Sequence, residues 1–233
     1  MDFAMPYNRP IRWLFLAAFW AAAAIALQPA VAREPGSGPP DRQRVDLSPG
    51  EKAQVSLFGV QAEGTKFVYV LDRSGSMGDS GNKGLAAAKA ALLASLAKLD
   101  TVHQFQIILY NERPRIFNPT GEPGRLAFGT DQNKAEVRRF FDSIGADGGT
   151  DHESALVLAI RLHPDVIFLM TDGDDPRLTA RQLARIERLG AGIIIHTFQF
   201  GAGPQREQIG FMEKLARQSG GEHVYVDVSK LGK

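Results

Sequence analysis

Oxygen-bearing side chains of this 233-residue chain gather at three places where a predicted strand ends or a predicted helix begins. The first is Asp-Arg-Ser-Gly-Ser, in which one carboxylate and two hydroxyls stand at alternate positions after an apolar run. Residues two apart point the same way in an extended loop, so these side chains can converge on one point. A Gly-Gly-Thr turn and a Thr-Asp-Gly turn are the other two places. The five candidate residues are Asp72, Ser74, Ser76, Thr150 and Asp172.

Two carboxylates and three hydroxyls form a set of hard oxygen ligands, which suits Mg²⁺ or Mn²⁺ with water completing the octahedron. Ca²⁺ is a further candidate, because it also takes oxygen ligands. The chain has no cysteine, which excludes disulfides, thiol nucleophiles and thiolate metal sites. Its five histidines show no His-x-x-x-His or similar metal spacing, and we interpret them as structural or exposed.

Apolar strands that alternate with amphipathic helices are expected to position these residues. Strands separated by helices of about 10–15 residues indicate a mainly parallel sheet with helices on both faces. Ligands of such sheets bind outside the carboxyl ends of the strands, where the three turns fall. We expect strands over 53–60, 67–71, 105–110, 114–117, 166–170, 193–200 and 223–228, and helices over 84–99, 133–144, 153–162, 179–189 and 207–219.

Two of these elements carry end signals of their own. Proline at the start of 114–117 predicts an edge strand, because it cannot donate to a neighbouring strand. For the helix over 179–189, Thr179 and Gln182 predict a capping box, and Gly190 predicts a left-handed residue after the last turn.

The order Asp-x-Ser-x-Ser, then Thr, then Asp resembles the metal-ion-dependent adhesion site of the von Willebrand factor type A domain family. All five positions of that motif are present, and the resemblance covers roughly residues 66–228. It implies an α/β fold with a doubly wound, mainly parallel sheet, helices on both faces and one short antiparallel edge strand. The predicted strand 114–117 fits that edge position.

The same resemblance implies how the site works. In the family, the two serines and the threonine bind the metal directly, here Ser74, Ser76 and Thr150, whereas the two aspartates act largely through water. A metal held mainly by neutral hydroxyls keeps much of its positive charge and favours an anionic sixth ligand. We therefore expect a binding module, not an enzyme, that engages an acidic side chain of a protein partner. Arg73 either adds a second cationic contact to that ligand or points to solvent.

The first 32 residues have the layout of a secretory signal peptide. Arg9 and Arg12 precede an uncharged apolar run over 13–27, and small residues follow at 30–32. That run is shorter than the ~20 residues that span a bilayer, so we favour cleavage over an uncleaved anchor at 13–32. Either way, the rest is exported, as a secreted or periplasmic protein. The expected divisions are a signal peptide (1–32), a flexible linker (33–52), a short strand with its connection (53–65) and the type A domain (66–233).

The net charge and the missing catalytic motifs argue against several other classes of function. The formal net charge is +1, and 25 basic and 25 acidic residues remain after the leader, which argues against nucleic-acid binding driven by bulk charge. Neither serine of the first motif sits in a Gly-x-Ser-x-Gly elbow. A magnesium-dependent phosphatase-like hydrolase is one alternative, although Ser74 stands where its acid/base aspartate would lie. A structural scaffold with incidental metal is another. Membrane contact is expected only through an uncleaved N-terminal segment.

Overall fold

The computed structural model describes residues 50–122, 124–173, 176–205 and 210–231, without the side chains of 79–82. All of these residues fall within the unit Asp46–Lys233. The expected signal peptide and most of the expected linker lie outside the described residues, as do Asp174 and Asp175 after the third turn. Within the described ranges, no helix is long and apolar enough to cross a membrane.

The central sheet is mainly parallel. Its strands are β3 (Lys66–Asp72), β4 (Gln104–Tyr110), β5 (Arg115–Ile116), β6 (Ala127–Phe128), β7 (Val166–Thr171), β8 (Ile194–Gly201) and β9 (His223–Asp227). They lie in the order β5-β4-β3-β7-β8-β9, and β6 also pairs with β4. The pairings among β4, β3, β7, β8 and β9 are parallel, whereas β5 and β6 pair with β4 in antiparallel. The expected α/β fold is therefore confirmed, and β5 lies within the range predicted for its antiparallel edge strand.

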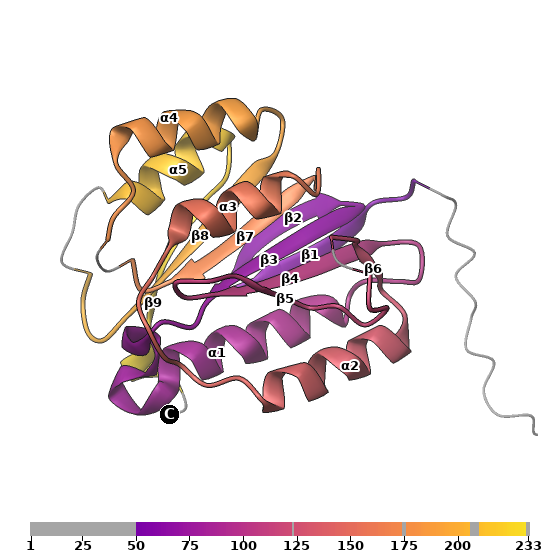
Figure 1. Cartoon of the computed structure of the whole chain (residues 1–233), viewed down its shortest axis with the longest axis horizontal. Helices are drawn as coiled ribbons and strands as arrows, with labels where there is room; N and C mark the ends of the chain where they lie inside the picture. The colour runs from indigo at the N-terminus through magenta and orange to yellow at the C-terminus, as the bar shows by residue number, and fades with distance from the viewer. Residues whose placement is uncertain (1–49, 123, 174–175, 206–209, 232–233) are drawn as a thin grey trace, which may run out of the picture. The chain divides into compact units, whose positions relative to one another are not determined.

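Helices cover both faces of this sheet. They are α1 (Asp79–Leu96), α2 (Asp131–Asp142), α3 (His152–Ile160), α4 (Ala180–Leu189) and α5 (Phe211–Ser219), with short 3₁₀ helices η1 (Gly75–Gly78) and η2 (Val228–Lys230). Figure 1 shows α1 and α2 on one face and α3, α4 and α5 on the other, and the buried side chains form two matching clusters. This is the layered arrangement in which the ends of parallel strands stay open to ligands.

The central strand β3 shows why a continuous apolar run is required here. Phe67, Tyr69 and Leu71 pack into the cluster under α1 and α2. Val68 and Val70 pack into the opposite cluster, against α3 and its neighbours. Because successive side chains of a strand point to opposite faces, a strand covered on both faces has no position for a polar residue until it ends.

The expected strand over 53–60 is wrong in one respect, since the structure has a hairpin there. Strands β1 (Ala53–Leu57) and β2 (Val60–Gly64) pair in antiparallel, and alternate residues of each are buried. The turn residues Phe58 and Gly59 both have positive φ, of 46° and 90°. Two such residues in sequence form the turn whose twist suits a two-residue hairpin, and Gly59 makes that turn accessible.

Helix ends were predicted with mixed success. In α4, Thr179 accepts from the Gln182 backbone and Gln182 accepts from the Thr179 backbone, so the capping box is confirmed. The left-handed end at Gly190 is wrong, because this residue has φ −95° and ψ 20°. Its N–H donates to the carbonyl of Ile186, which closes the last turn without a left-handed residue.

Gly221, which joins α5 to β9, provides a test of this packing. A methyl group at Gly221 would collide with the backbone carbonyl oxygen of Ile195 in the neighbouring strand, whereas one at Gly145 would meet nothing within 4 Å. We expect Gly221→Ala to lower the free energy of unfolding by roughly 2–3 kcal/mol, as overpacking against a rigid neighbour does. Gly145→Ala is the matched control and should change it by less than ~0.5 kcal/mol. Equal effects in urea unfolding would contradict the placement of this connection.

Candidate metal centre

The carboxyl ends of β3 and β7 bring the first candidate residue against a residue that sequence reasoning missed. The two strands pair in parallel with Leu71 opposite Met170, so their last residues are neighbours. The Asp72 carboxylate is fully buried, and the Thr171 hydroxyl donates to its Oδ2 at 2.6 Å. Its Oδ1 accepts from the backbone N–H of Ser74 at 2.8 Å. The carboxylate is thus fixed by two neutral donors.

Ser74 and Ser76 lie side by side, but for a different reason from the expected one. Their hydroxyl oxygens are 3.2 Å apart. The chain is not extended here, because η1 starts at Gly75 and the Met77 N–H donates to the Ser74 carbonyl at 3.1 Å. The hydrogen bond from the Ser74 amide to the Asp72 carboxylate favours this bend, as short polar side chains do in turns. The side chains therefore converge through a tight turn.

Asp172 reaches the same edge of the sheet from β7. The Thr171 hydroxyl accepts from the Gly173 N–H at 3.1 Å while it donates to Asp72, so it links the first and third turns. Gly173 has φ +72°, and a Cβ there would lie 3.0 Å from the Met212 sulfur. Glycine is required at this position, because the backbone turns sharply against α5. The Asp172 carbonyl accepts from the Gln199 side chain at 3.2 Å, which anchors the turn to β8.

The turn that carries Thr150 is attached to the first turn through the backbone. The Gly75 N–H donates to the Gly148 carbonyl at 3.0 Å, and the Asp147 N–H donates to the Arg73 carbonyl at 2.8 Å. Asp151, directly after Thr150, caps α3 by accepting from the Ser154 N–H. Thr150 is held between these anchors and is partly exposed.

A second clamp on the Thr150 turn comes from the turn after β4, which sequence reasoning did not connect with the site. The Asn111 side-chain amide donates to the backbone carbonyl and the carboxylate of Asp147, at 3.1 and 3.0 Å. The backbone carbonyl of Asn111 accepts from the backbone N–H of Asp151 at 2.8 Å. Glu112 accepts from the Gly149 N–H at 3.1 Å. These contacts hold the Thr150 turn on both sides of Thr150.

Of the two roles that the sequence suggested for Arg73, the one in which it simply points to solvent is wrong. Its guanidinium forms an ion pair with the Asp147 carboxylate, and only 18% of its side chain is exposed. The side chain therefore does not simply point to solvent. Its charge is matched inside the chain, and the pair adds a further link between the first turn and the Thr150 turn.

The electrostatics of the site are dominated by the buried carboxylate. Burial raises the pKa of Asp72 from 3.8 to about 6, and the nearby charge of Asp172 adds to that increase. The hydrogen bonds from Thr171 and Ser74 act in the opposite direction but do not compensate. Burial also raises the pKa of Tyr110 well above 10, and its hydroxyl is hydrogen-bonded to Nδ1 of His152 at 2.8 Å. His152 is thus a buried structural residue at the start of α3.

A metal site built from the residues that the structure describes would need hydroxyl ligands. Within the described ranges, no group of three or more histidine, cysteine, aspartate or glutamate side chains is placed to hold a metal. Asp72, Ser74 and Ser76 are joined by direct hydrogen bonds, Asp172 is linked to them through Thr171, and Thr150 only through its loop. Thr171 could have been suspected as the last residue of its strand, beside Asp172. Nothing local marks Asn111 or Glu112.

Several solved structures share the fold of this domain. A von Willebrand factor type A protein from Catenulispora acidiphila superposes with a TM-score of 0.61 at 22% identity, over 79% of this chain and 49% of that one. The protein BatB from Bacteroides thetaiotaomicron gives a TM-score of 0.51 at 18% identity, over 70% of this chain and 91% of that one. Proximal thread matrix protein 1 from the mussel byssus has zinc in its metal-ion-dependent adhesion site (MIDAS) motif. It superposes with a TM-score of 0.51 at 16% identity, over 71% of this chain and 42% of that one. At these identities the likeness shows the fold alone.

Sequence comparison identifies the family. No curated protein gives a significant match, and the chain spans about half the length of the Catenulispora protein. Residues 67–174 match the family model of the von Willebrand factor type A domain. That range contains all five candidate ligands, and the sheet around it has the topology that the resemblance implied. The chain therefore contains a von Willebrand factor type A domain.

Proposed function

We propose that this chain is an exported binding module that engages an acidic group of a protein partner through a divalent metal ion, with Mg²⁺ as the first candidate. Domains of the von Willebrand factor type A family are in general binding modules rather than enzymes. The observation that carries the proposal is the fully buried carboxylate of Asp72, which lies beside two adjacent serine hydroxyls at the carboxyl edge of the sheet.

The donor set fits a divalent cation. A charged carboxylate without a cation is costly to bury, and the raised pKa of Asp72 reflects that cost. Its two described hydrogen bonds come from a neutral amide and a neutral hydroxyl. Oxygen ligands of this kind suit Mg²⁺, Mn²⁺ or Ca²⁺. In the mussel protein a site of this type takes zinc, which is consistent with a divalent ion. The residues that would hold the metal are Asp72, Ser74, Ser76, Thr150 and Asp172.

The same donor set indicates the chemistry of the partner. Three of the five groups are neutral hydroxyls, and the family resemblance places the two aspartates behind water, so a bound divalent ion would keep much of its positive charge and would attract a carboxylate from outside. The role proposed for the chain is to hold the metal ion and the partner's carboxylate in place, not to transfer a proton. The turn after β4 holds the Thr150 loop, the Arg73–Asp147 pair ties that loop to the first turn, and Thr171 aligns the two aspartates.

Export and its destination are part of the proposal and depend on the first 32 residues. A basic start, an apolar middle and small residues before position 33 support a cleaved signal, which gives a secreted or periplasmic protein. An uncleaved segment at 13–32 would instead anchor the domain to the membrane.

Metal-free stability provides the first test. Because the folded pKa of Asp72 is raised to about 6, the folded state holds this proton more tightly than the unfolded state. The free energy of unfolding should therefore fall by roughly 3 kcal/mol between about pH 4 and pH 6 and stay low above that range. Asp72→Asn keeps the acceptor for Ser74 and removes the charge. In chelator at about pH 8 it should melt at a higher temperature than the wild type, and at about pH 4 at a similar one.

Addition of Mg²⁺ should remove most of that difference in melting temperature between the wild type and Asp72→Asn. At ~100 times its dissociation constant the ion should raise the wild-type melting temperature by about 5–10 °C, and Asp72→Asn should gain almost nothing. Asp100→Asn, which removes an exposed carboxylate beyond α1, is the control and should follow the wild type. A variant Asp72→Asn that is less stable than the wild type in chelator, or that gains as much from Mg²⁺, would contradict the proposed site.

Partner capture tests the function itself. The mature protein on a resin should retain an exported protein of its source organism in Mg²⁺ and release it in chelator. Thr150→Ala removes one ligand hydroxyl and should lose most of that capture. Thr101→Ala, an exposed threonine in the turn before β4, should retain it. Capture that resists both chelation and Thr150→Ala would exclude a metal-dependent contact and would favour a structural scaffold.

A generic phosphoester substrate distinguishes the hydrolase alternative. Ser74 occupies the position of the acid/base aspartate, and its hydroxyl lies beside Ser76 rather than beside a second carboxylate. We expect no turnover above background in Mg²⁺. Turnover that Asp72→Ala abolishes would replace the binding module with an enzyme.

A further inference from the structure

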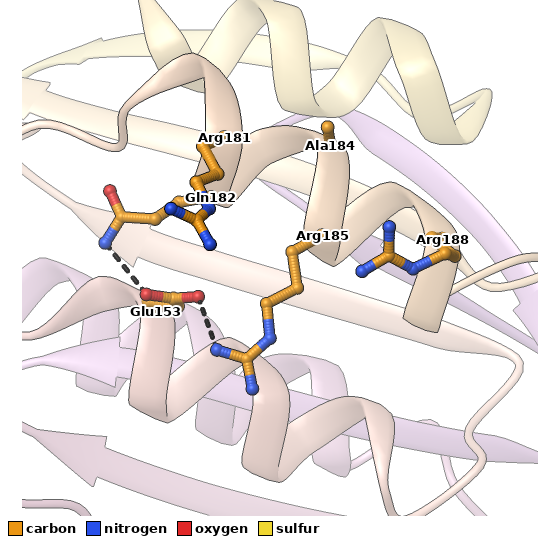
Figure 2. Close-up of a pocket in the computed structure, with 6 residues that line it drawn as sticks. All are labelled: Glu153, Arg181, Gln182, Ala184, Arg185 and Arg188. Carbon is orange, nitrogen blue, oxygen red and sulfur yellow. Dashed lines mark hydrogen bonds and ion pairs between the residues drawn. The ribbon is translucent and has the colours of Figure 1, made fainter.

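A groove of about 640 Å³ lies between α3 and α4 and is lined by charged side chains. Figure 2 shows that Arg181, Arg185 and Arg188 project from α4, with Glu153 of α3 opposite. The Glu153 carboxylate accepts from Gln182 at 2.8 Å and from Arg185 at 2.9 Å (Figure 2). Only Glu153 contributes negative charge to this lining.

The three arginines form one row. They stand at positions i, i+4 and i+7, and such positions share one side of a helix. All three are exposed. Arg185 is paired with Glu153, but neither Arg181 nor Arg188 forms an ion pair with any residue that the structure describes. The groove therefore holds more positive charge than the described residues neutralise.

This concentration of charge is local. Residues 176–189 contain four arginines and one acidic residue, Glu187, in a chain whose basic and acidic residues nearly balance. Glu187 accepts from Gln218 of α5 and so lies on a different side of α4 from Glu153. A weakly charged molecule with one basic row does not attract polyanions from a distance, but it can position an acidic group that is already close.

The groove begins beside the candidate metal centre. Glu153 lies in the first turn of α3, three residues after Thr150. Arg181 lies in the first turn of α4, the helix that follows the Asp172 turn along the chain. A ligand that leaves the metal between these two turns would enter the groove and then follow the arginine row.

We propose that the groove between α3 and α4 binds an extended, acidic segment of the protein partner, whose residues lie beyond the carboxylate at the metal. This rests on the proposed function for its first contact. The segment's chemistry follows from the row. Along the helix axis Arg181 and Arg185 are separated by about 6 Å and Arg185 and Arg188 by about 4.5 Å, whereas residues two apart on an extended chain are separated by about 6.6 Å. The long arginine side chains can span the difference, so aspartate or glutamate at alternate positions would come within their reach, and the guanidinium fork matches a carboxylate with two hydrogen bonds.

A labelled peptide with aspartate at every second position and glycine between is the probe. Its binding to the mature protein is measured by fluorescence anisotropy in Mg²⁺, with an asparagine version as the control peptide. Arg181→Glu with Arg188→Glu should weaken binding of the aspartate peptide at least about ten-fold, because two attractive contacts become repulsive. Lys98→Glu with Arg138→Glu makes the same change in net charge away from the groove, at exposed positions after α1 and on α2, and should weaken it less than about two-fold.

The outcomes separate this inference from the proposed metal site. In chelator, the affinity of the protein for the aspartate peptide should fall. The ratio between the dissociation constants of the two double variants should persist, because the groove does not need the metal. Loss of the ratio in both conditions would overturn the groove and leave the metal site untouched, whereas equal binding of the asparagine peptide would overturn both the groove and the carboxylate contact at the metal. Insensitivity to chelator with the ratio intact would instead count against the metal site. Tighter binding of a single-stranded oligonucleotide of equal charge, lost in the same groove variant, would overturn a protein segment as the occupant.

Discussion

The burial of one negative charge governs the design of this domain. The central strand β3 is covered on both faces, and it ends in a carboxylate that is fully buried and held by neutral donors. In that environment burial raises the pKa of Asp72 to about 6, so the ionised form destabilises the fold at neutral pH. A divalent cation at this edge would remove that cost. Stability and ligand binding are then linked, because the group that weakens the metal-free domain is the one that attracts the ion.

The rest of the fold holds three turns around that charge. Parallel pairing of β3 with β7 places Asp72 beside Thr171, and the hydroxyl of Thr171 connects both aspartate-bearing turns. The Thr150 loop is distant in sequence and is held at the site by backbone contacts with Arg73, Gly75, Asn111 and Glu112. A site fixed by such contacts is organised before any ligand arrives, which lowers the entropy cost of binding. Charge on α4 would then extend recognition beyond the metal.

The sequence predicted those parts of the structure that depend on local pattern. Continuous apolar runs identified β3 and β7, and the polar residues at their ends marked the candidate site. What escaped prediction depends on contacts between distant segments. The Arg73–Asp147 pair joins residues 74 positions apart, and the Asn111 contact with the same loop spans 36. The convergence of Ser74 and Ser76 was predicted from extended geometry, whereas the structure brings the two side chains together at the start of a 3₁₀ helix.

Anomalous diffraction from crystals grown in Mn²⁺ tests the central claim most directly, because the manganese signal locates the ion without reference to any assumed ligand. The account predicts one strong peak at the carboxyl ends of β3 and β7, within coordination distance of the hydroxyl oxygens of Ser74, Ser76 and Thr150. Asp72 and Asp172 should lie close behind it, through water. An intact domain without a peak at this edge, or with its ion bound elsewhere, would contradict the account.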